Sequence, residues 1–198
     1  MIEHVRVAAE NVTSLVPLTR FAKTDLYEDE ITALIRMPLA ASVRFLRWTV
    51  TYQSPGGYSA KGNAGKRDLV IEQNASTIAV IEAVVCRNPV TYESVQKELT
   101  SHFQKLLGYS SCAMFLHLTY SYADYPSSVL GHLKSIAEKA APPAFAYRGL
   151  KDIPPPDSGP TGFIAEYQGP RGPVKVVFLV LDMRQQAQVD AARIAGNS

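Results

Sequence analysis

RDLVIE (67–72) and TIAVIEAVVC (77–86) decide the fold, because both stretches are rich in β-branched and aliphatic residues and predict strands. Four residues, QNAS (73–76), join them, a length that is typical of a hairpin connection. The second stretch is almost continuously apolar, which predicts a strand in the middle of a sheet that is covered on both faces. The sequence therefore predicts two paired strands at the centre of the protein.

Outward from this pair, apolar periodicity predicts three helices and further strands. The helices are expected at 25–36, with Asp25 as a cap and Pro38 as the stop, at 89–107 and at 127–140. Strands are expected at 43–52, 111–122, 163–167 and 174–183, the last two joined by a turn at 169–172. The segment SPGGYSAKGNAGK (54–66) predicts a turn or a mobile flap, and residues 1–23 allow either an opening strand or an adaptor segment. This order of elements indicates an α/β fold.

Composition narrows the class of protein. The chain has 198 residues, 46% of them hydrophobic, and a net charge of +2, which predicts one domain and no strong global field toward nucleic acid or membranes. Cys86 and Cys112 lie in apolar runs without zinc-ligand spacing, so we expect reduced core thiols. The N-terminus lacks a signal-peptide pattern and no stretch approaches the ~20 apolar residues of a membrane span. We therefore expect a cytoplasmic protein with no membrane partner.

Two carboxylates interrupt the central pair of apolar strands. Asp68 and Glu82 can meet at one end of the sheet, where two acidic oxygens suit a hard ion such as Mg²⁺. A buried unpaired carboxylate costs several kcal/mol, so each also has a structural interpretation. Asp68 would accept backbone amides, and Glu82 would pair with Arg67, Arg87 or Lys105. The sequence is compatible with both interpretations.

The motifs of P-loop, dinucleotide-binding, zinc-protease and serine-hydrolase sites are absent from the sequence. Three segments, GKRDLVIE (65–72), IAVIEA (78–83) and HFQKL (102–106), instead resemble the PD-(D/E)XK restriction-endonuclease-like superfamily. The resemblance covers about residues 25–122. It implies a three-layer α/β/α fold with a central mixed sheet of about five strands, and a Mg²⁺ or Mn²⁺ ion held by Asp68 and Glu82.

The chain departs from the family pattern at one position. Val84 stands where the family has a lysine two residues after the glutamate. Some members are understood to supply this lysine from the following helix, which makes Lys105 the candidate here, although a solvated surface lysine is the alternative. The resemblance also offers Glu28 or Glu30 of the first helix as an auxiliary metal ligand, although Glu28 equally fits a helix cap.

Other polar residues have two interpretations each. Lys61, Lys66 and Arg67 lie in or beside the Gly-rich segment and would contact phosphates of DNA, or simply keep a loop soluble. His102 and His117 are interpreted as packed, hydrogen-bonded histidines rather than catalytic bases.

The resemblance implies a metal-dependent DNA endonuclease with Asp68, Glu82 and Lys105 as catalytic residues, of a kind often found in bacterial defence or mobile-element systems. The alternative is a nuclease-like domain that has lost catalysis and binds nucleic acid, a partner protein or another copy of itself; a scaffold without any site is the third. The expected layout of the single domain is an N-terminal extension (1–24), a nuclease-like core (25–140), a strand pair (161–184) and a tail (185–198).

Overall fold

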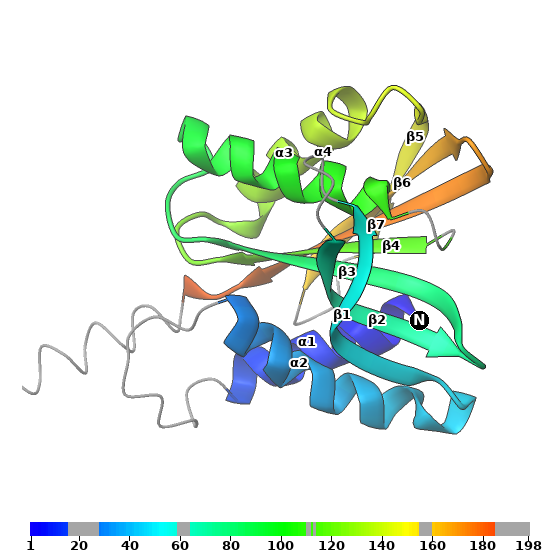
Figure 1. The fold of residues 1–198 in the computed structure, drawn as a ribbon. Coiled ribbons are helices and arrows are strands. Elements are labelled where there is room, and N and C mark those ends of the chain that lie inside the picture. Colours follow the sequence, from blue (N-terminus) through cyan, green and yellow to red (C-terminus); the bar gives the residue numbers. More distant parts are fainter. Residues whose placement is uncertain (16–27, 59–63, 110–111, 113, 155–159, 185–198) are drawn as a thin grey trace, which may run out of the picture.

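The computed structural model describes residues 1–15, 28–58, 64–109, 112, 114–154 and 160–184 (Figure 1). The described residues form one mixed sheet of seven strands in the order β1-β2-β3-β4-β7-β6-β5. The strands are β1 (Thr49–Tyr58), β2 (Ala64–Gln73), β3 (Ser76–Cys86), β4 (Met114–Ser121), β5 (Ala146–Ile153), β6 (Thr161–Gly169) and β7 (Gly172–Asp182). The expected α/β class is confirmed.

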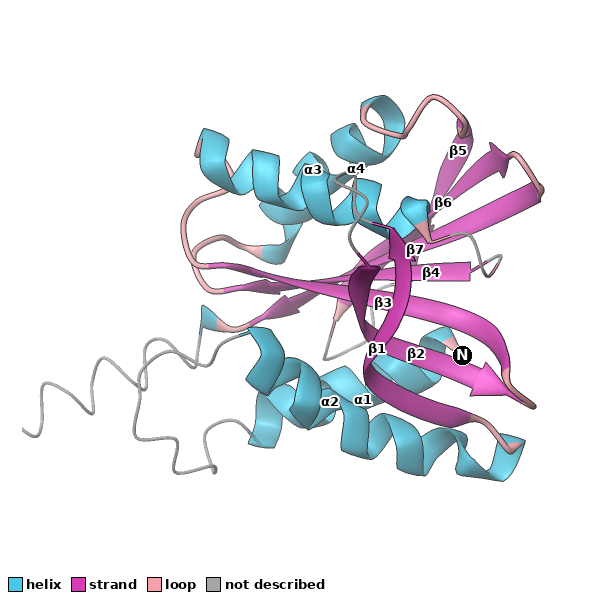
Figure 2. Ribbon diagram, in the orientation of Figure 1, coloured by secondary structure: helices cyan, strands magenta, loops and turns pink. Residues whose placement is uncertain are grey.

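Two pairs of helices cover the two faces of this sheet (Figure 2). One face carries α1 (Ile2–Leu15) and α2 (Glu28–Val43), which a short 3-10 helix, Arg44–Leu46, follows. The other face carries α3 (Glu93–Gly108) and α4 (Pro126–Lys139). Among the described residues, no helix is long and apolar enough to cross a membrane.

The strands β1, β2 and β3 form an antiparallel meander, and β3 then leads through α3 to β4, which is parallel to it. Asn74 and Ala75 close the β2–β3 hairpin with φ angles of 51° and 62°, the left-handed geometry of a two-residue turn that follows the twist of the strands. Beyond β4, the strand β7 is parallel to it, and β6 and β5 continue antiparallel. The chain thus switches from antiparallel to parallel pairing at β3.

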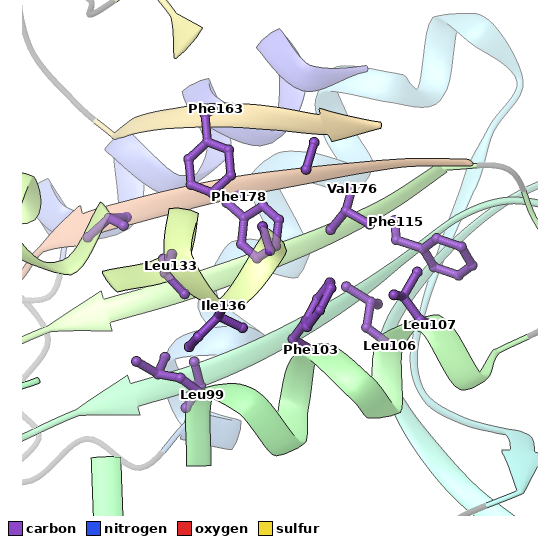
Figure 3. Packing of buried hydrophobic residues seen from close by; sticks show 14 of the residues in the cluster. Leu99, Phe103, Leu106, Leu107, Phe115, Leu133, Ile136, Phe163, Val176 and Phe178 are labelled. Atoms are coloured by element: carbon purple, nitrogen blue, oxygen red, sulfur yellow. The ribbon is translucent and has the colours of Figure 1, made fainter. Parts of the chain in front are cut away.

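Each face of the sheet has its own hydrophobic core. On the α3/α4 face, Phe103 packs against Phe178, and Phe178 stacks on Phe163 with ring centroids 4.6 Å apart (Figure 3). The central strand β3 contributes side chains to both cores in alternation, as expected for a strand covered on both sides. Cys86 is buried in the core on the α3/α4 face, Cys112 is half-buried beside it, and both are free thiols.

The sheet has seven strands instead of the roughly five that the resemblance implies, and β5 is the strand that the sequence did not predict. β5 lies in the Pro-rich region 141–160, and its residues are mostly exposed or half-buried at an edge of the sheet, so they carry no apolar signal. The segment 54–66 was expected to be a turn or flap, yet β1 runs to Tyr58 and β2 starts at Ala64. Main-chain hydrogen bonds pair the end of β1 with the start of β2, although the side-chain pattern of this segment does not predict a strand.

The helical boundaries also differ from expectation. α2 continues through Pro38 to Val43, because Ile35, Leu39 and Val43 are fully buried and this packing outweighs the hydrogen bond lost at a proline. The strand expected from residue 43 therefore begins only at Thr49. Residues 2–15 form α1 rather than a strand, whereas the expected cap Asp25 lies outside the described residues.

Candidate active site

The two carboxylates lie opposite each other on neighbouring strands. In the antiparallel pairing of β2 and β3, Leu69 faces Ile81, and the same register puts Asp68 opposite Glu82. Val80 and Val84 belong to the core under α3 and α4, so Glu82 between them points to the same face. The hairpin thus brings both acidic side chains under α3.

The helix α3 supplies the groups that meet Glu82. Its apolar stripe is buried against β3, and Lys105 lies at the edge of this stripe with its side chain 35% exposed, whereas the side chain of Glu82 is 0% exposed. The Lys105 Nζ donates to Glu82 Oε2 at 2.6 Å. Tyr109, just past the end of α3, hydrogen-bonds the same carboxylate with its phenol, and His102 Nδ1 lies 3.8 Å from Glu82 Oε2. Glu82 Oε1 is buried and has no hydrogen-bond partner among the described residues.

Asp68 is held by the backbone of the neighbouring strand. Its Oδ2 accepts a hydrogen bond from the amide of Ala83 at 2.8 Å. Burial raises the pKa of Asp68, while this amide and the Lys105 ammonium act in the opposite direction. Asp29, in the first turn of α2, adds a further negative charge that raises the same pKa. The carboxylate is therefore fixed in direction by β3 and lies in a partly desolvated, acidic environment.

Glu82 is the most strongly perturbed acid of the cluster. Burial, followed by the negative charge of Asp68, raises its pKa to about 7, although the Lys105 charge and the hydrogen bonds from Lys105 and Tyr109 oppose this rise. Ionising two neighbouring carboxylates in a desolvated environment has a high free-energy cost. A cation that neutralises the pair would bind there with a favourable electrostatic contribution.

Two neutral histidines surround this cluster. His117 lies beside Glu82 in the parallel pairing of β3 and β4, and its Nδ1 is 3.2 Å from Thr119 Oγ1. Burial lowers the pKa of His117 to about 3, and burial together with the Lys105 charge lowers that of His102 to about 4. Both imidazoles are thus uncharged at neutral pH, in line with their interpretation as packed residues.

A scan against protein-family models, a search of curated proteins and a search of solved structures each gave no match.

The Asp68 and Glu82 carboxylates are the oxygen donors of this cluster that could hold a metal ion. Among the described residues, no group of three or more His, Cys, Asp or Glu side chains is arranged to hold a metal ion. Mg²⁺, however, commonly binds through one or two carboxylates and keeps water or substrate phosphate oxygens at its other positions. The buried, unpartnered Oε1 of Glu82 beside Asp68 fits this kind of site.

The structure thus brings together the three predicted catalytic residues, Asp68, Glu82 and Lys105. Arg67 is half-buried next to them on β2, and Lys66 belongs to the same strand. The side chain of Lys66 and all of Lys61 lie outside the described residues.

Two residues that were not predicted as site residues, Asp29 and Tyr109, act on the carboxylate pair. The side chain of Glu28 lies outside the described residues and Glu30 is exposed, whereas Asp29 is the acid of α2 whose charge acts on Asp68. Tyr109 is buried in the core under α3, and its phenol reaches Glu82. Its position four residues after Lys105 was the available signal, since such residues share a helix face.

Proposed function

We propose that this protein is a divergent PD-(D/E)XK-like, metal-dependent DNA endonuclease, of the kind associated with bacterial defence or mobile elements. The observation that supports this proposal best is the cluster in which the Lys105 Nζ lies 2.6 Å from Glu82 Oε2, with Asp68 directly across the strand pair. The succession of a helix, strands bearing the two acids, a second helix and a parallel strand agrees with the core that the resemblance implies.

Asp68 and Glu82 would hold the metal ion through Glu82 Oε1 and the Asp68 carboxylate. A bound Mg²⁺ or Mn²⁺ supplies Lewis-acid chemistry, lowering the pKa of a water molecule and neutralising charge on the phosphate. The protein holds these oxygens in place beforehand, because the Ala83 amide fixes Asp68 and Lys105 fixes Glu82. Such preorganisation avoids reorganisation during the reaction.

Lys105 takes the part of the lysine that Val84 replaces. Its ammonium group donates hydrogen bonds only, so it orients the attacking water or stabilises the negative charge on the phosphate as the P–O bond breaks. Arg67, Lys66 and Lys61 are the basic residues that would contact phosphates of the DNA backbone.

The test is Mg²⁺- or Mn²⁺-dependent cleavage of plasmid and single-stranded DNA by the wild type and by Asp68→Asn, Glu82→Gln and Lys105→Met. These substitutions keep the side-chain size and remove one charge each. Lys97→Met is the matched control, because Lys97 also lies on α3 and also pairs at 2.6 Å, with Glu93, but at the exposed surface. Cleavage that disappears in the three variants and persists in the control supports the proposal; cleavage that persists in Glu82→Gln contradicts it.

A domain that has lost catalysis is the second candidate. Its supporting observation is that each carboxylate already has an internal partner, Lys105 for Glu82 and the Ala83 amide for Asp68. In that case the wild type cuts no DNA and calorimetry with Mn²⁺ shows no heat of binding. Mn²⁺-dependent cleavage that Asp68→Asn abolishes would rule out this candidate.

A further inference from the structure

A concave feature lies near the carboxylate cluster, between the end of α3, the start of β4 and the β6–β7 turn. It is a cavity of about 170 Å³, and its walls are mostly apolar and aromatic. Its lining includes Leu107, Tyr109, Phe115, Phe145, Arg171 and Val174. Leu107 and Phe115 lie side by side at this end of the core (Figure 3).

Tyr109 links the cavity to the candidate active site. Its side chain lines the cavity, while its phenol hydrogen-bonds the Glu82 carboxylate. The Arg67 charge acts on the pKa of both Tyr109 and Cys112, a further residue of the wall, so this guanidinium lies near the cavity. A group in the cavity would thus be one tyrosine side chain away from the carboxylates.

Arg171 gives the cavity an available positive charge. It is exposed in the β6–β7 turn, and no carboxylate of the described part of the chain pairs with it. By contrast Lys175, further along β7, is paired with Glu166 at 3.2 Å. An aromatic, apolar cavity with a free guanidinium at its opening suits a flat ring attached to an anionic backbone.

We propose that this cavity receives one nucleobase of the substrate, with Tyr109 and Phe145 as aromatic walls and Arg171 on the neighbouring phosphate. The inference rests on the proposed function. Sites for drug-sized ligands occupy ~300–1,000 Å³, so a cavity of about 170 Å³ accommodates a single small ring system. A base reaches such a cavity only when it is unpaired, so the preferred substrate is single-stranded or distorted DNA rather than regular duplex.

The experiment measures binding without cleavage, by fluorescence anisotropy in EDTA. The probes are a labelled single-stranded DNA oligonucleotide, the same backbone with abasic sites, and the corresponding duplex. Val174→Phe fills the cavity and Arg171→Gln removes its charge. Val7→Phe on α1 and Arg36→Gln on α2 make the same changes at exposed positions on the opposite face of the sheet.

We expect the wild type to bind the base-containing strand about tenfold more tightly than the abasic strand, because a stacked base contributes ~1.4 kcal/mol, within the usual range. Val174→Phe should remove this difference, Arg171→Gln should weaken binding of both strands, and the two controls should behave as the wild type. Arg171 is exposed in a turn, so its variant remains informative if Val174→Phe fails to fold.

Equal binding of base-containing and abasic strands by the wild type, or an unchanged preference in a folded Val174→Phe, overturns the base-binding inference. This outcome differs from failure of the nuclease proposal, because the binding experiment contains no metal ion. Base-dependent binding without any cleavage would support the base-binding inference and contradict the nuclease proposal. Cleavage without base-dependent binding would support the nuclease proposal and contradict the base-binding inference.

Discussion

Replacing Lys105 by methionine should destabilise the protein only when Glu82 is ionised. Removing one partner of a buried ion pair costs ~3–5 kcal/mol. Lys105 is 35% exposed, so solvent screening reduces this cost by about half, to ~2 kcal/mol. The carboxyl of Glu82, whose pKa is raised to about 7, is protonated in the folded protein at pH 5 and ionised at pH 8.5. The cost should therefore be small at pH 5 and reach ~2 kcal/mol at pH 8.5.

The sign of this effect follows from the raised pKa. The folded state binds the Glu82 proton more tightly than the unfolded state, so the contribution of Glu82 to stability is full below its usual pKa of 4.5 and declines as pH rises toward 7. Without the Lys105 charge the pKa rises further and the decline continues above pH 7. Only the variant should lose stability in that upper range.

Urea denaturation of the wild type and Lys105→Met at both pH values measures this difference. Lys97→Met is the control, since the pair of Lys97 with Glu93 has the same 2.6 Å distance but side chains that are 74% and 79% exposed. It should change the free energy of unfolding by less than ~0.5 kcal/mol at either pH. A cost for Lys105→Met that is equal at pH 5 and pH 8.5 would refute the coupling between this pair and the protonation of Glu82.

Two further predictions concern the core. Tyr167→Phe should lower the free energy of unfolding by ~1–2 kcal/mol in urea denaturation, because its buried hydroxyl donates to the Ala137 carbonyl at 2.7 Å; an unchanged stability would contradict this. Gly162→Ala should cost ~3 kcal/mol, because the added Cβ would overlap the carbonyl oxygen of Phe178. Its control Gly131→Ala, which meets no atom within 4 Å in the helix α4, should instead stabilise the protein by ~0.5–1 kcal/mol; equal effects of the two would refute the packing argument.

The centre of the fold was predictable from the sequence, whereas its edges were not. The strands 67–72 and 77–86 and the helix up to residue 107 appear where apolar patterning predicts them, because their side chains face a core. The edge strand β5 and the paired ends of β1 and β2 are held by main-chain hydrogen bonds that leave no pattern in the side chains. The continuation of α2 through Pro38 depends on tertiary packing, which local rules do not include.

Only the part of the site that side-chain patterning indicates was predictable from the sequence. Asp68 and Glu82 were identifiable because each interrupts an apolar run, and strand pairing then determines that they meet. The approach of Tyr109 and Asp29 depends on how α3 and α2 sit over the sheet. A single sequence contains no direct signal for such placement.

The packing of α3 on β3 explains why the lysine lies on the helix rather than on the strand. Val84 is fully buried and packs in the core beneath α3, so a lysine there would have to extend from the centre of that core to reach Glu82. Lys105 reaches the same carboxylate from above, with part of its side chain in solvent, and this lowers the cost of keeping an ammonium group beside a buried acid. The same interface therefore accommodates an apolar residue on the strand and a charged one on the helix. Lys105 thereby contacts Glu82 at 2.6 Å, the distance of a direct hydrogen bond, without a charge in the centre of the core.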